Sequence, residues 1–105
     1  MEKKRNNKKE FSQLIIKAVE GLRKREFEKS YQVIIESLEE NPNAPEPQNL
    51  LGIWQELQGN DDMARKHYRA AYALDPTYKP ASENLERLCE PLIENRERID
   101  FDKIN

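Results

Sequence analysis

Cys89 and His67 are the residues whose types would suit a nucleophile and its base, and each type occurs only once in this chain of 105 residues. We expect Cys89 on the apolar side of a helix, where a free cysteine is usually an inert core residue. We expect His67 at a solvated helix position. The sequence therefore predicts no catalytic site and no enzyme.

Metal and phosphate chemistry are also disfavoured. Asp61 and Asp62 are neighbours, so on a helix their carboxylates point apart, and no further ligand is placed to join them. One cysteine and one histidine exclude a multi-Cys/His zinc site and an internal disulfide. The three glycines form no phosphate-binding loop. We therefore expect no cofactor and no metal.

The charge balance limits the partners. The chain has 18 Lys and Arg against 20 Asp and Glu, without the basic excess of a dedicated nucleic-acid binder. No apolar run approaches the roughly 18 residues that a membrane helix needs. Residues 1–9 are basic, and we interpret them as a flexible, solvated arm, with an anionic membrane or RNA as the alternative contact. With no export signal and a single cysteine, we expect a cytoplasmic protein.

The elements that would position any site come from an internal repeat of the sequence. Residues 11–44 align with residues 45–78, and the matched residues agree in size or character. The matched pairs are Ala18 and Gly52, Ser30 and Ala64, Ile34 and Tyr68, Ser37 and Ala71, and Pro42 and Pro76.

Apolar residues within each copy recur at helical spacing. We predict helices over residues 10–23, 26–40, 46–58 and 61–74, with turns near Lys24-Arg25 and Gly59-Asn60. Such short turns require antiparallel packing, so each copy is a helical hairpin. The fold class is therefore all-α, with one domain over residues 10–95.

Residues 79–95 are predicted to form a helix that caps the second hairpin. Pro80 opens it, and Leu85 and Leu88 belong to its apolar face, which would cover the last apolar surface of the stack. Pro91 should kink or end this helix. Residues 96–105 then form a C-terminal tail.

The second copy also carries a specific pattern. Leu51-Gly52 is followed at fixed spacing by Gly59, Ala64, Tyr68, Ala71 and Pro76. This pattern resembles that of the tetratricopeptide repeats. It departs from the family at Gln55 and Gln48, where aromatic residues are usual. The resemblance implies an α-α superhelix whose concave groove binds an extended peptide or a helix of a partner protein.

By this resemblance, the first helix of each hairpin and the capping helix line the groove. Much of the expected lining is apolar, and a contiguous exposed apolar patch is uncommon in a monomer. We therefore expect an apolar or amphipathic partner, whereas the Lys and Asn set that grips a chaperone's C-terminal carboxylate is absent. The alternative is that these residues simply pack beneath the cap or the tail. The expected lining is Ile15, Ile16, Val19, Leu22, Arg23, Asn49, Leu50, Ile53, Glu56, Leu57, Glu83, Asn84 and Arg87.

The tail is itself a candidate occupant of the groove. Ile99 and Phe101 are two residues apart, the spacing of an extended segment with one apolar side. The tail can fold back into the groove, enter the groove of a second copy and make a homodimer, or stay disordered. Trp54 is interpreted as a core residue, with stacking on a ligand as the alternative.

Two function classes follow from the sequence. The first is a non-catalytic module that binds a peptide or helix of a partner protein in an apolar groove. The second is a self-associating structural unit whose groove is filled by its own tail or by a second copy.

Overall fold

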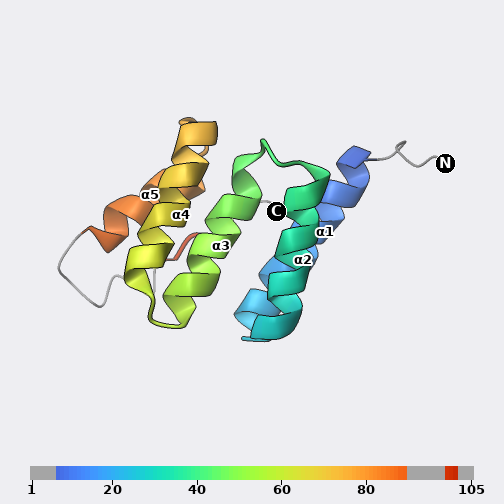
Figure 1. The fold of residues 1–105 in the computed structure, drawn as a ribbon, viewed down its shortest axis with the longest axis horizontal. Coiled ribbons are helices and arrows are strands. Elements are labelled where there is room, and N and C mark those ends of the chain that lie inside the picture. Colours follow the sequence, from blue (N-terminus) through green and yellow to red (C-terminus); the bar gives the residue numbers. More distant parts are fainter. Residues whose placement is uncertain (1–6, 90–98, 102–105) are drawn as a thin grey trace.

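The computed structural model describes residues 7–89 and 99–101, and within them it contains helices and no strand (Figure 1). The all-α prediction is therefore confirmed. None of the described helices is long and apolar enough to cross a membrane. The helices are α1 (Asn7–Arg23), α2 (Phe27–Glu40), α3 (Pro45–Leu57), α4 (Asp61–Leu74) and α5 (Lys79–Leu88).

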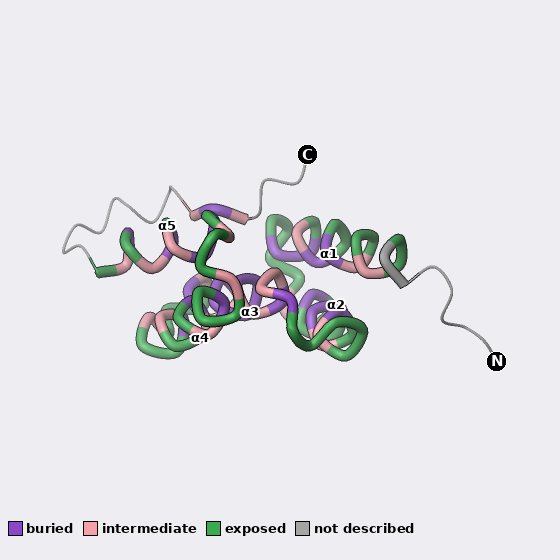
Figure 2. Tube along the Cα trace, turned by 90° about the horizontal axis from the view of Figure 1, so that it is seen from above, coloured by how far each residue is buried: buried purple, intermediate pink, exposed green. Residues whose placement is uncertain are grey.

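The helices form two antiparallel hairpins, α1 with α2 and α3 with α4, and α5 packs against the second hairpin (Figure 1). The central element is α3, because it contacts each of the other four helices. Figure 2 shows α1 and α5 on one side of α3, and α2 and α4 on the other. We call the side that carries α1 and α5 the inner face.

The backbone repeats with the same period as the sequence. Helix α4 begins and ends at the residues that align with the first and last residues of α2, and α5 begins at the residue that aligns with the first residue of α3. The turn bonds repeat as well, since the Glu26 N–H donates to the Gly21 carbonyl at 2.8 Å and the Asn60 N–H to the Gln55 carbonyl at 2.9 Å. Both hairpins are therefore copies of one structural unit.

Each of the two hairpin turns contains a residue with positive φ, but the residue type differs between them. Arg25 has a φ of 58° in the first turn, and Gly59 has a φ of 88° at the matching place in the second. The left-handed region costs a residue with a Cβ about 1 kcal/mol, whereas glycine adopts it readily. The second turn therefore fits its sequence better than the first.

Two boundaries differ from the predictions. Helix α1 begins at Asn7, so residues 7–9 are helical and do not belong to a flexible arm; Lys8 and Lys9 are good helix formers. Helix α5 ends at Leu88 instead of reaching residue 95, and Pro91 cannot continue its hydrogen-bond ladder. The predicted cap beyond Cys89 lies outside the described residues.

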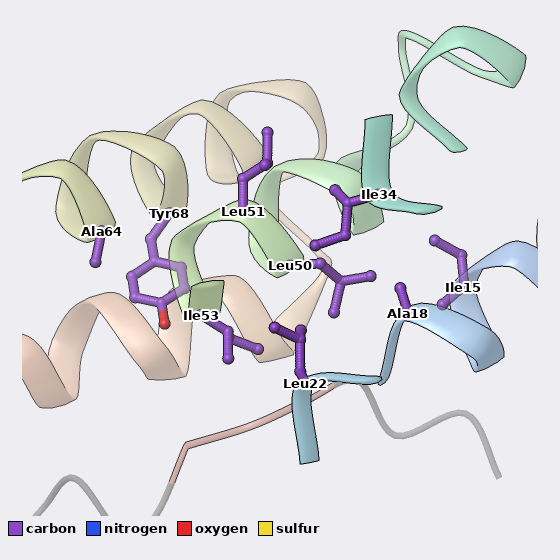
Figure 3. Packing of buried hydrophobic residues seen from close by; sticks show 9 residues of the cluster. All are labelled: Ile15, Ala18, Leu22, Ile34, Leu50, Leu51, Ile53, Ala64 and Tyr68. Carbon is purple, nitrogen blue, oxygen red and sulfur yellow. The ribbon is translucent and has the colours of Figure 1, made fainter. Parts of the chain in front are cut away.

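One apolar cluster joins the two hairpins (Figure 3). Leu50 of α3 points toward Ala18 and Leu22 of α1, and Tyr68 of α4 lies against α3 on the other side. Because α3 is covered on several sides, most of its apolar residues are internal. The cluster consists of Ile15, Ala18, Leu22, Ile34, Leu50, Leu51, Ile53, Ala64 and Tyr68.

Gly52 permits the close approach of α3 and α4. A Cβ added there would lie 2.6 Å from Cδ1 of Tyr68, whose side chain is wholly buried. We expect Gly52→Ala to lower the free energy of unfolding by about 1–3 kcal/mol, because the ring must shift in a packed interior. Urea denaturation followed by circular dichroism measures this change.

Gly21→Ala is the matched control, since its Cβ would meet the Cβ of Ser30 at 3.0 Å. Its smaller displacement of neighbours is offset by the higher helix propensity of alanine, about 1 kcal/mol. Equal destabilisation by the two substitutions would contradict the close contact at Gly52.

Candidate functional site

Residues 99–101, which we call the tail segment, lie across the inner face between α1 and α5 (Figure 2). Ile99 and Phe101 pack against the apolar cluster, and Asp100 between them is only 9% exposed. Of the three arrangements considered for the tail, the structure has the one in which it folds back onto its own chain. The rest of the predicted tail, residues 96–98 and 102–105, lies outside the described residues.

Asn84 of α5 pairs with both backbone polar groups of Asp100. The Asp100 N–H donates to Oδ1 of Asn84 at 2.7 Å, and Nδ2 of Asn84 donates to the Asp100 carbonyl at 2.9 Å. Asn49 of α3 donates from its own Nδ2 to the same carbonyl at 3.3 Å. One amide can bond to both groups only where they point to the same side, as in extended backbone, and these contacts do not involve the side chain of Asp100.

A buried polar network fixes the orientation of the Asn84 amide. Nη2 of Arg87 donates to Oδ1 of Asn84 at 3.1 Å, so this oxygen must face Arg87. Arg87 also makes a bidentate ion pair with Glu56, with N···O distances of 2.6 and 2.8 Å. The Tyr68 hydroxyl donates to Oε1 of Glu56 at 2.8 Å. The network therefore ties α3, α4 and α5 together directly behind the tail segment.

Burial and pairing determine the charges in this network. Burial raises the pKa of the Tyr68 hydroxyl well above 10.0, and the charge of Glu56 raises it further. Desolvation acts to lower the pKa of Arg87, but its hydrogen bonds with Glu56 and the charge of that carboxylate outweigh this effect, and the pKa is raised. Tyr68 is therefore neutral and Arg87 charged at neutral pH.

The aromatic ring of the tail segment meets a cation. The guanidinium carbon of Arg23 in α1 lies 4.5 Å from the centroid of the Phe101 ring. Such a contact contributes about 0.5–1 kcal/mol at an exposed site. Arg23 is exposed and Phe101 is half-buried, so the contact is made by a surface side chain.

The predicted groove residues have separate places in the structure. Arg23, Asn49 and Asn84 contact the tail segment, whereas Glu56 and Arg87 pair with each other. The exposed apolar patch expected from the sequence is largely internal, because the neighbours of α3 cover it. Ile15, Leu22, Asn49, Leu50, Ile53, Glu56, Asn84 and Arg87 are buried, Val19 and Leu57 are half-buried, and Ile16, Arg23 and Glu83 are exposed.

Cys89 and His67 are placed differently from the predictions, whereas Trp54 packs against the core as predicted. Cys89 is exposed, because α5 ends beside it. His67 is half-buried, with Nδ1 2.9 Å from Oε1 of Gln48, and burial lowers its pKa. Trp54 is half-buried and donates from Nε1 to the Phe27 carbonyl at 2.9 Å, so it contributes to the packing between the hairpins. Within the described residues, no three His, Cys, Asp or Glu gather in a way that could hold a metal.

Comparisons of the chain with models of known protein families, with curated proteins and with solved structures give no match. A function must therefore be inferred from the contacts on the inner face.

The Tyr68 hydroxyl makes stability dependent on pH in the alkaline range. Its pKa is raised in the folded state, so above the ordinary value of 10.0 the unfolded chain releases this proton before the folded chain does. Stability should then fall with rising pH, by up to about 1.4 kcal/mol per pH unit from this group.

Urea titrations at several pH values between 8 and 11 measure the slope, and Tyr68→Phe should reduce it. The matched control is Tyr72→Phe, which removes an exposed hydroxyl from the same helix. A slope unaffected by Tyr68→Phe would refute the assignment to this group.

The ion pair between Glu56 and Arg87 is the polar contact of the site whose loss should lower stability most, because both charges are buried. Glu56→Gln leaves the buried guanidinium without its charge partner, and we expect a loss of about 3–5 kcal/mol in the free energy of unfolding. The exposed pair of Lys29 with Glu26 provides the control, because Lys29→Gln should change stability by less than about 1 kcal/mol. Urea denaturation compares the two variants, and similar losses would contradict the buried pairing.

Proposed function

We propose that this chain is a non-catalytic protein-interaction module whose inner face holds an extended peptide segment of a partner protein. The pairing of Asn84 with both backbone groups of Asp100 carries this proposal. A side-chain amide that bonds to the N–H and carbonyl of one residue imitates the edge of a β-strand, which is how many proteins bind extended peptides. Any extended backbone can offer the same two groups.

The repeat supports the proposal from a second direction. The same period recurs in the sequence, in the helix boundaries and in the turn hydrogen bonds. We infer that the chain is a small tetratricopeptide-repeat protein, a family whose first helices line a peptide groove. In this chain α1, α3 and α5 occupy those places, and they supply Arg23, Asn49 and Asn84 respectively.

The second candidate function is a self-associating unit whose groove is filled by a tail. The position of the tail segment favours it, since the groove is already filled within one chain. Exchange of the segment between two copies would keep every contact and form a dimer. Sedimentation equilibrium tests the exchange between copies: a dimer that dissociates when Ile99 and Phe101 are replaced by serine supports it, and a monomer of 12.4 kDa excludes it.

Binding of an added peptide tests the proposed function. The full chain carrying Ile99→Ser and Phe101→Ser, which we call the released chain, should free the inner face. A fluorescent peptide of the sequence RERIDFDKIN, residues 96–105, should bind to it in an anisotropy titration. Asn84→Ala in the released chain should weaken binding about tenfold, because two backbone hydrogen bonds are lost.

Glu83→Ala is the matched control, since Glu83 precedes Asn84 on α5 and makes no contact with the Asp100 backbone among the bonds described above. Circular dichroism establishes that each variant keeps its helices. If the peptide does not bind to the folded released chain, the inner face is not a peptide site. If the Asn84→Ala and Glu83→Ala variants of the released chain bind the peptide equally well, Asn84 does not bind the peptide backbone.

A further inference from the structure

We propose that the partner's segment carries an aliphatic and an aromatic side chain two residues apart, and that the chain's own Ile99 and Phe101 compete with it for the same site. We call this site, formed by Arg23, Asn49, Asn84 and the adjoining apolar cluster, the seat. This inference rests on the proposed function and adds the chemistry of the partner and the regulation of the site. The tail segment serves as the template, because it shows which features of an extended peptide the inner face contacts.

The spacing follows from the way the backbone is held. Asn84 fixes the N–H and the carbonyl of Asp100 along one edge of an extended segment. Side chains one residue before and one residue after therefore project to the same side, and both Ile99 and Phe101 pack against the apolar cluster. A segment with its apolar residues one or three apart would turn one of them to solvent.

The preference for an aromatic residue follows from Arg23. Its guanidinium lies 4.5 Å from the centre of the Phe101 ring. The face of an aromatic ring attracts a cation, and an aliphatic side chain at this place offers no such attraction. Arg23 is exposed and stands at the end of α1, so it contacts the ligand and is not buried in the core.

The seat keeps its internal hydrogen bonds when the tail segment leaves. Nδ2 of Asn84 donates to Oδ1 of Asn49 at 3.0 Å, and Arg87 donates to Oδ1 of Asn84 at 3.1 Å. The charge of Arg87 is balanced by Glu56 whether or not the tail segment is present. Departure of the segment exposes amides, which water solvates readily, together with the part of the apolar cluster that Ile99 and Phe101 cover, and it leaves this ion pair intact. The seat is therefore built to be vacated and refilled.

The tail segment competes with an added peptide because it is covalently connected to its seat. The tail segment belongs to the same chain as its seat, so an added peptide competes with a local concentration on the order of millimolar. The released chain should therefore bind the peptide RERIDFDKIN at least about tenfold more tightly than the intact chain does. A partner that displaces the segment must have a better match to the seat or a second contact elsewhere.

Anisotropy titrations of full-length chains test both parts. The peptides are the parent sequence, one with Phe101→Leu, one with Ile99→Ser and one with a glycine inserted after Asp100. Against the released chain, Phe101→Leu should weaken binding about threefold, and the Ile99→Ser and inserted-glycine peptides about tenfold. Arg23→Gln in the released chain should remove the difference between the parent and Phe101→Leu peptides, which assigns the aromatic preference to that contact.

Failures of the two proposals are distinguishable. If all four peptides bind equally to the released chain, the side-chain pattern is wrong although the peptide site stands. If none of them binds, the proposed function fails as well. Equal affinity of the parent peptide for the intact and released chains overturns the competition. So does a dimer of the intact chain that becomes a monomer in the released chain, because the occupant is then a second copy.

A loss of helix in the released chain would call for a milder variant. The full chain with Phe101→Leu keeps an apolar side chain against the cluster and loses only the ring over Arg23. Its affinity for the parent peptide should exceed that of the intact chain about threefold. An unchanged affinity would overturn the competition.

Discussion

The buried ion pair between Glu56 and Arg87 is the interaction on which the rest of the inner face depends. It joins α3 to α5. Its carboxylate accepts a hydrogen bond from the Tyr68 hydroxyl of α4, and its guanidinium donates to Oδ1 of Asn84 and so sets the direction of that amide. A buried pair of this kind offsets its desolvation only when further hydrogen bonds surround it. The contacts that hold α5 in place therefore also orient the amide that pairs with the Asp100 backbone.

The fold was predictable because the internal repeat shows the same pattern of helices and turns twice in the sequence. The boundaries of α2 and α4 followed from apolar spacing and short turns, and both turns lie where they were expected. The ends of the two outermost helices were less predictable, because they extend or stop where the repeat no longer constrains them. Lys8 and Lys9 extend α1 beyond its apolar stripe, and the end of α5 left Cys89 exposed instead of buried.

The candidate site was predictable by position and not by chemistry. Sequence reasoning placed Arg23, Asn49 and Asn84 on one face, where the structure has them in contact with the tail segment. It assigned the apolar residues Leu50 and Ile53 to an exposed groove, although both are wholly buried. The reason is physical: in so small a stack α3 is the central helix, so its apolar residues complete the core before they can serve a ligand. Among the predicted groove residues, the polar ones identify the contact with the tail segment, because Arg23, Asn49 and Asn84 make it.

The amides of Asn49 and Asn84 and the apolar residues of the core are buried together, although polar and apolar groups respond differently to burial. Leu22, Leu50 and Ile53 belong to the apolar interior, whereas Asn49 and Asn84, which are equally buried, pair through their amides with the Asp100 backbone. Amides buried beneath a permanent cover would add little that apolar residues of similar volume could not supply, since burial of polar groups is unfavourable unless every bond is made. Their presence at the contact with the tail segment is explained if the cover is exchangeable, because amides are then solvated in the open state and bonded in the filled one.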